Sequence, residues 1–127
     1  MRYLIVLLLA GCATTQPQWV YTPPTYIQID YSRKPPSDWP VLETKVQYGE
    51  MADIRRWCSK TATEANKDKL VACAIPYFEW GMCMIFLSGR DPAWLDHEEA
   101  HCRGYGHVGD RVNYQAQAWE AFKAKRK

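Results

Sequence analysis

The 127-residue sequence has no strong excess of charge of either sign, and this argues against partners that are bound mainly through their charge. Sixteen lysine and arginine residues stand against fourteen acidic residues, which gives a formal net charge of +2. The basic cluster of the chain lies at its end, where cations favour a helix C-terminus, and consists of Lys123, Lys125, Arg126 and Lys127. A nucleic-acid-binding protein is expected to show a wider basic face or a reading motif. We therefore expect no nucleic-acid partner.

Long apolar runs are absent near the N-terminus, where residues 4–9 form a short run behind Arg2. A helix that crosses a bilayer needs about 20 apolar residues, so this run is too short to span a membrane by itself. A positive residue followed by a short apolar run is typical of a secretory signal peptide. The N-terminus is therefore interpreted as a processing signal and not as part of the fold.

The apolar run ends in Leu9-Ala10-Gly11-Cys12. This ending resembles the bacterial lipobox, in which a cysteine preceded by small residues is acylated and becomes the mature N-terminus. The resemblance implies a lipoprotein signal peptide over residues 1–12 and attachment to the membrane through a lipid anchor at Cys12. Because Ala13 stands where retained lipoproteins carry aspartate, it also implies the outer membrane of a bacterial cell envelope, facing the periplasm. The alternative is an ordinary secretory signal cut nearby, with Cys12 incidental.

Four cysteines remain after Cys12, an even number in a chain expected to be exported; they are Cys58, Cys73, Cys83 and Cys102. In an oxidising compartment this count predicts two disulfides, each contributing about 2–4 kcal/mol. Four cysteines allow three pairings. The pairing Cys73–Cys83 is favoured because these residues flank an expected hairpin, and it would leave Cys58–Cys102. A zinc site built on the four thiols is the alternative, and their lack of close paired spacing argues against it.

Residues 13–40 have the composition of a tether that precedes a compact domain over residues 41–127. Six prolines fall within this stretch, a density that excludes helix and central strand and favours extended chain. Aromatic and branched residues between the prolines, from Trp19 to Trp39, argue against a fully disordered arm. We therefore expect part of the arm to pack on the domain surface or on a partner.

The pattern of the domain predicts a small α+β fold. Strands are expected at residues 41–48, 70–75 and 82–87. Helices are expected at residues 50–60, at residues 92–103, and from residue 114 to about residue 125. Asp91 and Pro92 form a start signal for the second helix, Gly104 is suited to end it, and residues 77–81 would close a hairpin. The expected architecture is a small antiparallel sheet with the second helix packed on it and a helix at the C-terminus.

All three histidines of the chain fall within one short segment, residues 97–107. His97 and His101 are four residues apart, so on a helix they project from one face and can bind the same ion. Gly104 lets the chain turn sharply, so that His107 can return as a third ligand. Three imidazoles and one open position describe a catalytic rather than a structural zinc site. We therefore predict one zinc ion per chain, with Glu98 close to the metal without binding it.

The segment resembles the extended signature of the metzincin metalloproteases, His-Glu-x-x-His-x-x-Gly-x-x-His, which residues 97–107 match at every defining position. The resemblance implies that the histidines are the zinc ligands and that Glu98 is the catalytic base. Together with the lipobox-like ending at Cys12, it implies a membrane-tethered zinc peptidase in which a zinc-bound water, activated by Glu98, attacks an amide carbonyl of a peptide or an envelope protein. Tyr105 or Tyr114 would be the candidate second electrophile, and Asp110 or a backbone carbonyl would orient a ligand imidazole.

Outside the motif the chain departs from the metzincin pattern. No methionine follows His107, so the methionine turn that lies beneath the metal in metzincins has no counterpart. The segment after this histidine, residues 108–127, has room only for a turn and one helix. The resemblance also implies that a strand ahead of the motif helix, at residues 82–87, borders the cleft and pairs with an extended peptide.

Two other functions are compatible with the sequence. In one, the chain is a non-catalytic zinc-binding lipoprotein that acts as a binding or structural module of the envelope, with the aromatic residues of the arm as its contact surface. In the other, it is a lysis lipoprotein of a phage or mobile element. This last function would need no zinc site, and so it leaves the three histidines without a role.

Overall fold

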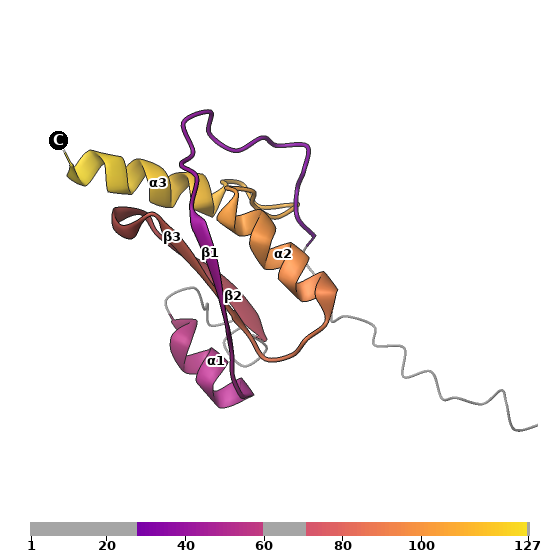
Figure 1. Cartoon of the computed structure of the whole chain (residues 1–127). Helices are drawn as coiled ribbons and strands as arrows, with labels where there is room; N and C mark the ends of the chain where they lie inside the picture. The colour runs from indigo at the N-terminus through magenta and orange to yellow at the C-terminus, as the bar shows by residue number, and fades with distance from the viewer. Residues whose placement is uncertain (1–27, 60–70, 127) are drawn as a thin grey trace, which may run out of the picture.

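The computed structural model describes residues 28–59 and 71–126, and these form a three-stranded sheet with helices packed on both of its faces (Figure 1). The predicted signal segment, Cys12 and the first part of the arm lie outside the described residues. Among the described residues, no helix combines the length and the apolar character that crossing a membrane requires.

The α+β class and the C-terminal helix are as predicted. In chain order the elements are β1 (Glu43–Tyr48), α1 (Met51–Trp57), β2 (Ala72–Tyr77), the 3-10 helix η3 (Phe78–Trp80), β3 (Met82–Leu87), α2 (Pro92–Cys102) and α3 (Tyr114–Lys125). β2 extends through Pro76, where the sequence had predicted its end. A proline is tolerated there because β2 is an edge strand, whose outer side does not need the missing N–H.

The strand order is β1-β3-β2, with β2 antiparallel and β1 parallel to the central strand β3. The sheet is therefore mixed, whereas the sequence had predicted a wholly antiparallel one. Parallel neighbours need a long crossover connection, and the chain between β1 and β3, which includes α1 and β2, supplies it. The expectation that residues 82–87 pair with an extended peptide is wrong, because both edges of β3 are already hydrogen-bonded to strands of the sheet.

Alternate residues of the strands divide the core into two layers. On one face of the sheet α2 packs over a buried cluster formed by Ala72, Ala74, Cys83, Ile85, Leu87 and Cys102. On the other face α1 packs over Cys73 through Ile54 and Cys58, with Trp57 against Phe86 at the edge of this layer. The period-2 alternation of strands thus places Cys73 and Cys83 on opposite faces.

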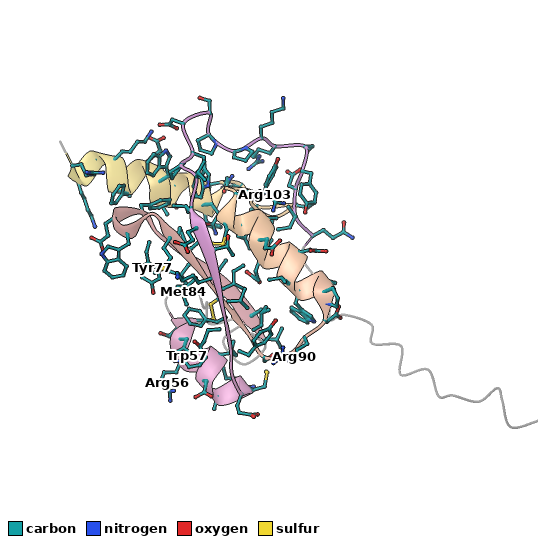
Figure 2. All side chains as sticks on the ribbon, viewed as in Figure 1. Arg56, Trp57, Tyr77, Met84, Arg90 and Arg103 are labelled. Atoms are coloured by element: carbon teal, nitrogen blue, oxygen red, sulfur yellow. A yellow bond between two sulfur atoms is a disulfide. The ribbon has the colours of Figure 1, made fainter. Side chains whose placement is uncertain are left out.

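Each layer contains one disulfide, and both appear as yellow bonds in Figure 2. Cys58–Cys73 joins the C-terminal end of α1 to β2, and Cys83–Cys102 joins β3 to the end of α2. Two disulfides were predicted, but the favoured pairing Cys73–Cys83 was wrong. Residues on opposite faces of neighbouring strands direct their side chains apart, so these two cysteines cannot bridge.

The second part of the arm, residues 28–40, packs on the domain and joins α3 to it. The ring centroid of Trp39 lies 5.3 Å from that of Phe78 and 6.3 Å from that of Trp119 on α3. Lys123 of α3 forms an ion pair with Asp38. In Figure 1 this segment is the indigo-to-purple trace that runs past the C-terminal end of α2.

Candidate metal centre

The motif helix α2 begins and ends with the residues that the sequence indicated. The side chain of Asp91 accepts a hydrogen bond from the N–H of Ala93 at 2.9 Å, and Pro92 occupies the first helical position, where no N–H is needed. Arg103, labelled in Figure 2, follows the last helical residue, and Gly104 then adopts a left-handed φ of 95°. We call residues 103–110, which turn back from this end of α2, the ligand loop.

Three imidazoles converge where α2 meets the ligand loop. The Nε2 atom of His107 lies 2.9 Å from Nε2 of His101 and 3.1 Å from Nε2 of His97. One ligand atom from each histidine lies within 4.8 Å of the others, so the three form a group that could hold a metal ion. The structure thus brings together the three residues that the sequence singled out, from a helix and from a loop beyond it.

The donor set and its dimensions fit a small divalent transition-metal ion. Imidazole nitrogens bind zinc at about 2.0–2.1 Å, so two such ligands around a tetrahedral ion lie about 3.4 Å apart. The observed separations of 2.9 and 3.1 Å are a few tenths of an ångström shorter. A small outward movement of the side chains therefore makes room for the ion, while the backbone stays in place.

Neighbouring groups orient two of the three imidazoles. The Nδ1 atom of His101 lies 2.8 Å from the carbonyl oxygen of Tyr105. Because a carbonyl only accepts, Nδ1 must carry the proton, and Nε2 is left with its lone pair toward the cluster. The Nδ1 atom of His107 lies 3.7 Å from a carboxylate oxygen of Asp110, the residue expected to orient a ligand. Such outer partners fix the tautomer and the direction of metal-binding histidines.

Burial keeps the three histidines in the uncharged form that a metal requires. Desolvation, with a smaller contribution from the neighbouring imidazoles, lowers the pKa of His97 to about 3 and that of His101 to about 4. The pKa of His107 is also lowered by burial, against a smaller opposing effect of Asp110. At neutral pH all three imidazoles therefore have a lone pair available without first losing a proton.

Glu98 follows His97 directly on α2, and its side chain is buried. Its exposed fraction is 6%, and burial raises the pKa of its carboxyl to about 8, so the metal-free protein holds it mainly as a neutral acid at pH 7. From helix geometry, Glu98 lies about 60° around the axis from His101, on the side that leads toward the sheet-facing Cys102. A cation bound at the three imidazoles would make this carboxyl easier to ionise.

The two tyrosines considered as electrophiles have different surroundings. Tyr105 lies in the ligand loop, where its backbone carbonyl contacts His101 and its ring packs 5.1 Å from that of Tyr31. Tyr114 begins α3 and is 61% exposed. A backbone carbonyl was expected as the alternative to Asp110 for orienting a ligand imidazole, and in the structure the carbonyl of Tyr105 has this position beside His101.

The arm was expected to pack on the domain, but its contact with the third histidine was not predicted. Ile29 forms an antiparallel β-bridge with His107. The N–H of Asp30 donates to the carbonyl of Gly106 at 2.9 Å, and the N–H of Val108 donates to the carbonyl of Gln28 at 2.8 Å. Short backbone pairings of this kind are independent of residue type, so only the folded chain reveals them.

No family model, no curated protein and no solved structure matches the chain. A function therefore has to be inferred from its own residues and geometry.

Proposed function

We propose that the chain is a membrane-tethered zinc-dependent peptidase, a minimal zincin-like hydrolase of amide bonds. The observation that carries the proposal is the convergence of three uncharged imidazoles, two of them on the helix that also carries the buried carboxylic acid of Glu98. Three nitrogen ligands leave one tetrahedral position open for substrate or water, whereas structural zinc sites use four protein ligands. The ligands proposed are His97, His101 and His107, with one zinc ion per chain.

Zinc bound to these histidines would act as a Lewis acid that polarises a carbonyl and lowers the pKa of water toward about 7. The proposed role of Glu98 is proton transfer. It would accept a proton from the attacking water and later deliver it to the leaving amide nitrogen. With the cation absent, burial raises the pKa of Glu98 to about 8, and a cation at the imidazoles would lower it again. Glu98 would thus become a base only when the metal site is filled.

The proposed location is the bacterial cell envelope, with a lipid anchor at Cys12. Its support is the lipobox-like ending of the N-terminal run and the presence of two disulfides, which persist in oxidising compartments. The proposed substrates are peptides or envelope proteins, because these are the amide-bonded molecules that such a compartment offers.

A non-catalytic metal-binding module is the second candidate function, and the size of the core favours it. The largest fully buried side chains of the described residues are three aliphatic residues and two disulfide-bonded cysteines: Ile54, Ile85, Leu87, Cys58 and Cys83. Small domains often need disulfides or a metal for stability. In this alternative the ion would stabilise the fold or a binding surface, and Glu98 would have no chemical role.

Metal stoichiometry is the first test of either function. The full chain, purified with its disulfides formed, is expected to bind about one zinc ion, and His101→Ala is expected to bind none tightly. If the wild type binds no zinc at neutral pH, both metal-dependent functions are overturned.

Hydrolysis of a peptide library then separates the two functions. Under the peptidase proposal, Glu98→Gln keeps the zinc and loses hydrolysis by a factor of about 100 or more, the typical contribution of a general base. Glu99→Gln is the matched control, since it makes the same change at the next position of the helix and is expected to keep activity. Zinc binding without hydrolysis of any peptide by the wild type would favour the non-catalytic module.

A further inference from the structure

The described part of the N-terminal arm follows the ligand loop. We call residues 28–39 the strap. Its first residues form the two backbone hydrogen bonds and the β-bridge described above, and these bracket His107 on both sides. Farther along, the guanidinium of Arg33 donates to the carbonyl of Asp110 at 3.3 Å. The strap therefore contacts the ligand loop before, at and after the third histidine.

The same segment contacts the residues that orient the imidazoles. The ring of Tyr31 packs against Tyr105, whose carbonyl contacts His101. Arg33 bonds to the backbone of Asp110, whose carboxylate lies near His107. Displacement of the strap would thus disturb the outer partners of two ligands.

The glycine of the motif has a second role at the other end of the strap. A Cβ on Gly104 would lie 2.8 Å from the ring of Trp39 and 2.9 Å from Cβ of Pro35. The indole N–H of Trp39 also donates to the carbonyl of Cys102, the last residue of α2, at 3.0 Å. The turn from the second ligand to the third is therefore packed directly against the strap.

Contacts within the domain hold the start of the ligand loop more than the part that contains His107. The N–H groups of Gly104 and Tyr105 bond back to α2, and Asn113 donates to the carbonyl of Gly104 at 2.7 Å. Beyond this point the backbone bonds to the strap through Gly106 and Val108, and the backbone bond within the ligand loop, from the N–H of Asp110 to the carbonyl of His107, is longer at 3.4 Å. The position of the third ligand consequently depends on a segment more than seventy residues earlier in the chain.

We propose that the strap is a positioning element of the metal centre: its docking brings His107 to the other two histidines, so that strap docking and metal binding strengthen each other. The inference rests on the metal site of the proposed function and adds the N-terminal arm to it. Linkage requires that if docking tightens metal binding by some factor, the metal tightens docking by the same factor.

Each decisive variant removes one hydrogen bond between the strap and the ligand loop. Asp30→Pro deletes the N–H that donates to Gly106, and Asp30→Ala is its control because it keeps that N–H. Arg33→Ala deletes the bond to Asp110, and Lys34→Ala makes the same charge change at the next exposed position. In the full chain, zinc affinity is measured by competition with a chromophoric chelator. We expect Asp30→Pro to weaken binding at least tenfold, Arg33→Ala to weaken it a few-fold, and each control to stay within twofold.

To separate an effect through His107 from a general structural effect of the proline, the zinc affinity of Asp30→Pro is measured again in the His107→Ala background. If the strap acts through His107, the proline has no further effect on the residual affinity of the two remaining histidines. An equal loss in both backgrounds would overturn the proposal.

The reciprocal effect is measured on the wild type, with His107→Ala as the control. Zinc is expected to slow amide exchange of Asp30 and Val108 severalfold, and to leave it unchanged in His107→Ala. Zinc binding with no change in these amides, or with unweakened affinity in Asp30→Pro, would overturn the strap proposal while the metal centre stands. Absence of zinc binding by the wild type would instead overturn the proposed function.

Discussion

The Nε2 atoms of His101 and His107 lie 2.9 Å apart, although the first belongs to the last turn of α2 and the second to the ligand loop. At this distance two protonated imidazoles would repel each other strongly, and burial lowers the pKa of both. Glu98, on the same helix, shows the opposite effect, since burial raises its pKa to about 8. In both cases the metal-free centre favours the uncharged form. The free energy of unfolding of the metal-free protein should therefore depend on pH in two separable ways, one from the histidines and one from Glu98.

The first prediction concerns Glu98 above pH 6.5 in the presence of a chelator. The unfolded state releases the proton of this carboxyl near pH 4.5, whereas the native state keeps it to about pH 8. The free energy of unfolding of the wild type, taken relative to that of Glu98→Gln so that the histidine contributions cancel, is therefore expected to fall by about 1 kcal/mol per pH unit between pH 6.5 and 8. Urea denaturation of both proteins measures this difference, and Glu99→Gln should keep the wild-type pH dependence. A difference that does not change with pH would contradict the burial of the Glu98 carboxyl.

The second prediction concerns the histidines below pH 6.5 and is measured in Glu98→Gln, which removes the opposing slope. In the unfolded state His101 takes up a proton near pH 6.5, but in the native state only near pH 4. Stability of the metal-free protein is thus expected to fall as the pH drops from 6.5 to 4.5, with about 1.4 kcal/mol per pH unit from this residue. Adding His101→Asn should make the slope shallower. An unchanged slope would show that another group titrates.

The third prediction concerns Gly104, which combines a φ of 95° with close contact to the strap. Gly104→Ala is expected to destabilise the protein by about 1–3 kcal/mol, because alanine is strained at this φ and its Cβ would overlap Trp39. Gly89→Ala is the control, since a Cβ there meets no described atom within 4 Å. Thermal unfolding of the metal-free proteins measures the difference, and equal melting temperatures would refute the close contact.

The fourth prediction compares the two disulfides, which enclose loops of similar length, with separations of 15 and 19 residues. Replacing either cysteine pair by serine is expected to lower the free energy of unfolding by about 3 kcal/mol, because the two disulfides constrain the unfolded chain to nearly the same extent. The two double-serine variants should, however, differ in zinc affinity. Loss of Cys83–Cys102 frees the end of α2 next to His101 and should weaken binding more than loss of Cys58–Cys73. Equal affinities would mean that the sheet contact alone positions α2.

Much of the motif helix was predictable because its signals are local. Asp91 and Pro92 mark its start within one turn, and Gly104 marks the change of direction after its end. The strand at residues 82–87 was predicted with its observed bounds, since six apolar residues in a row suit a central strand. The parallel pairing of β1 was not predictable, because all six of its residues are exposed and their pattern does not specify a partner strand.

By itself, the sequence determined the α+β class, the two disulfides as a number, and the three histidines as a group, because spacing along a helix and cysteine count are properties of neighbouring residues. The tertiary structure decided which cysteines pair and what positions the third histidine. Cys73 and Cys83 lie on opposite faces of the sheet, a fact that depends on the register of two strands. The strap reaches His107 through backbone hydrogen bonds, which every residue except proline can donate and which only the folding of the whole chain brings together.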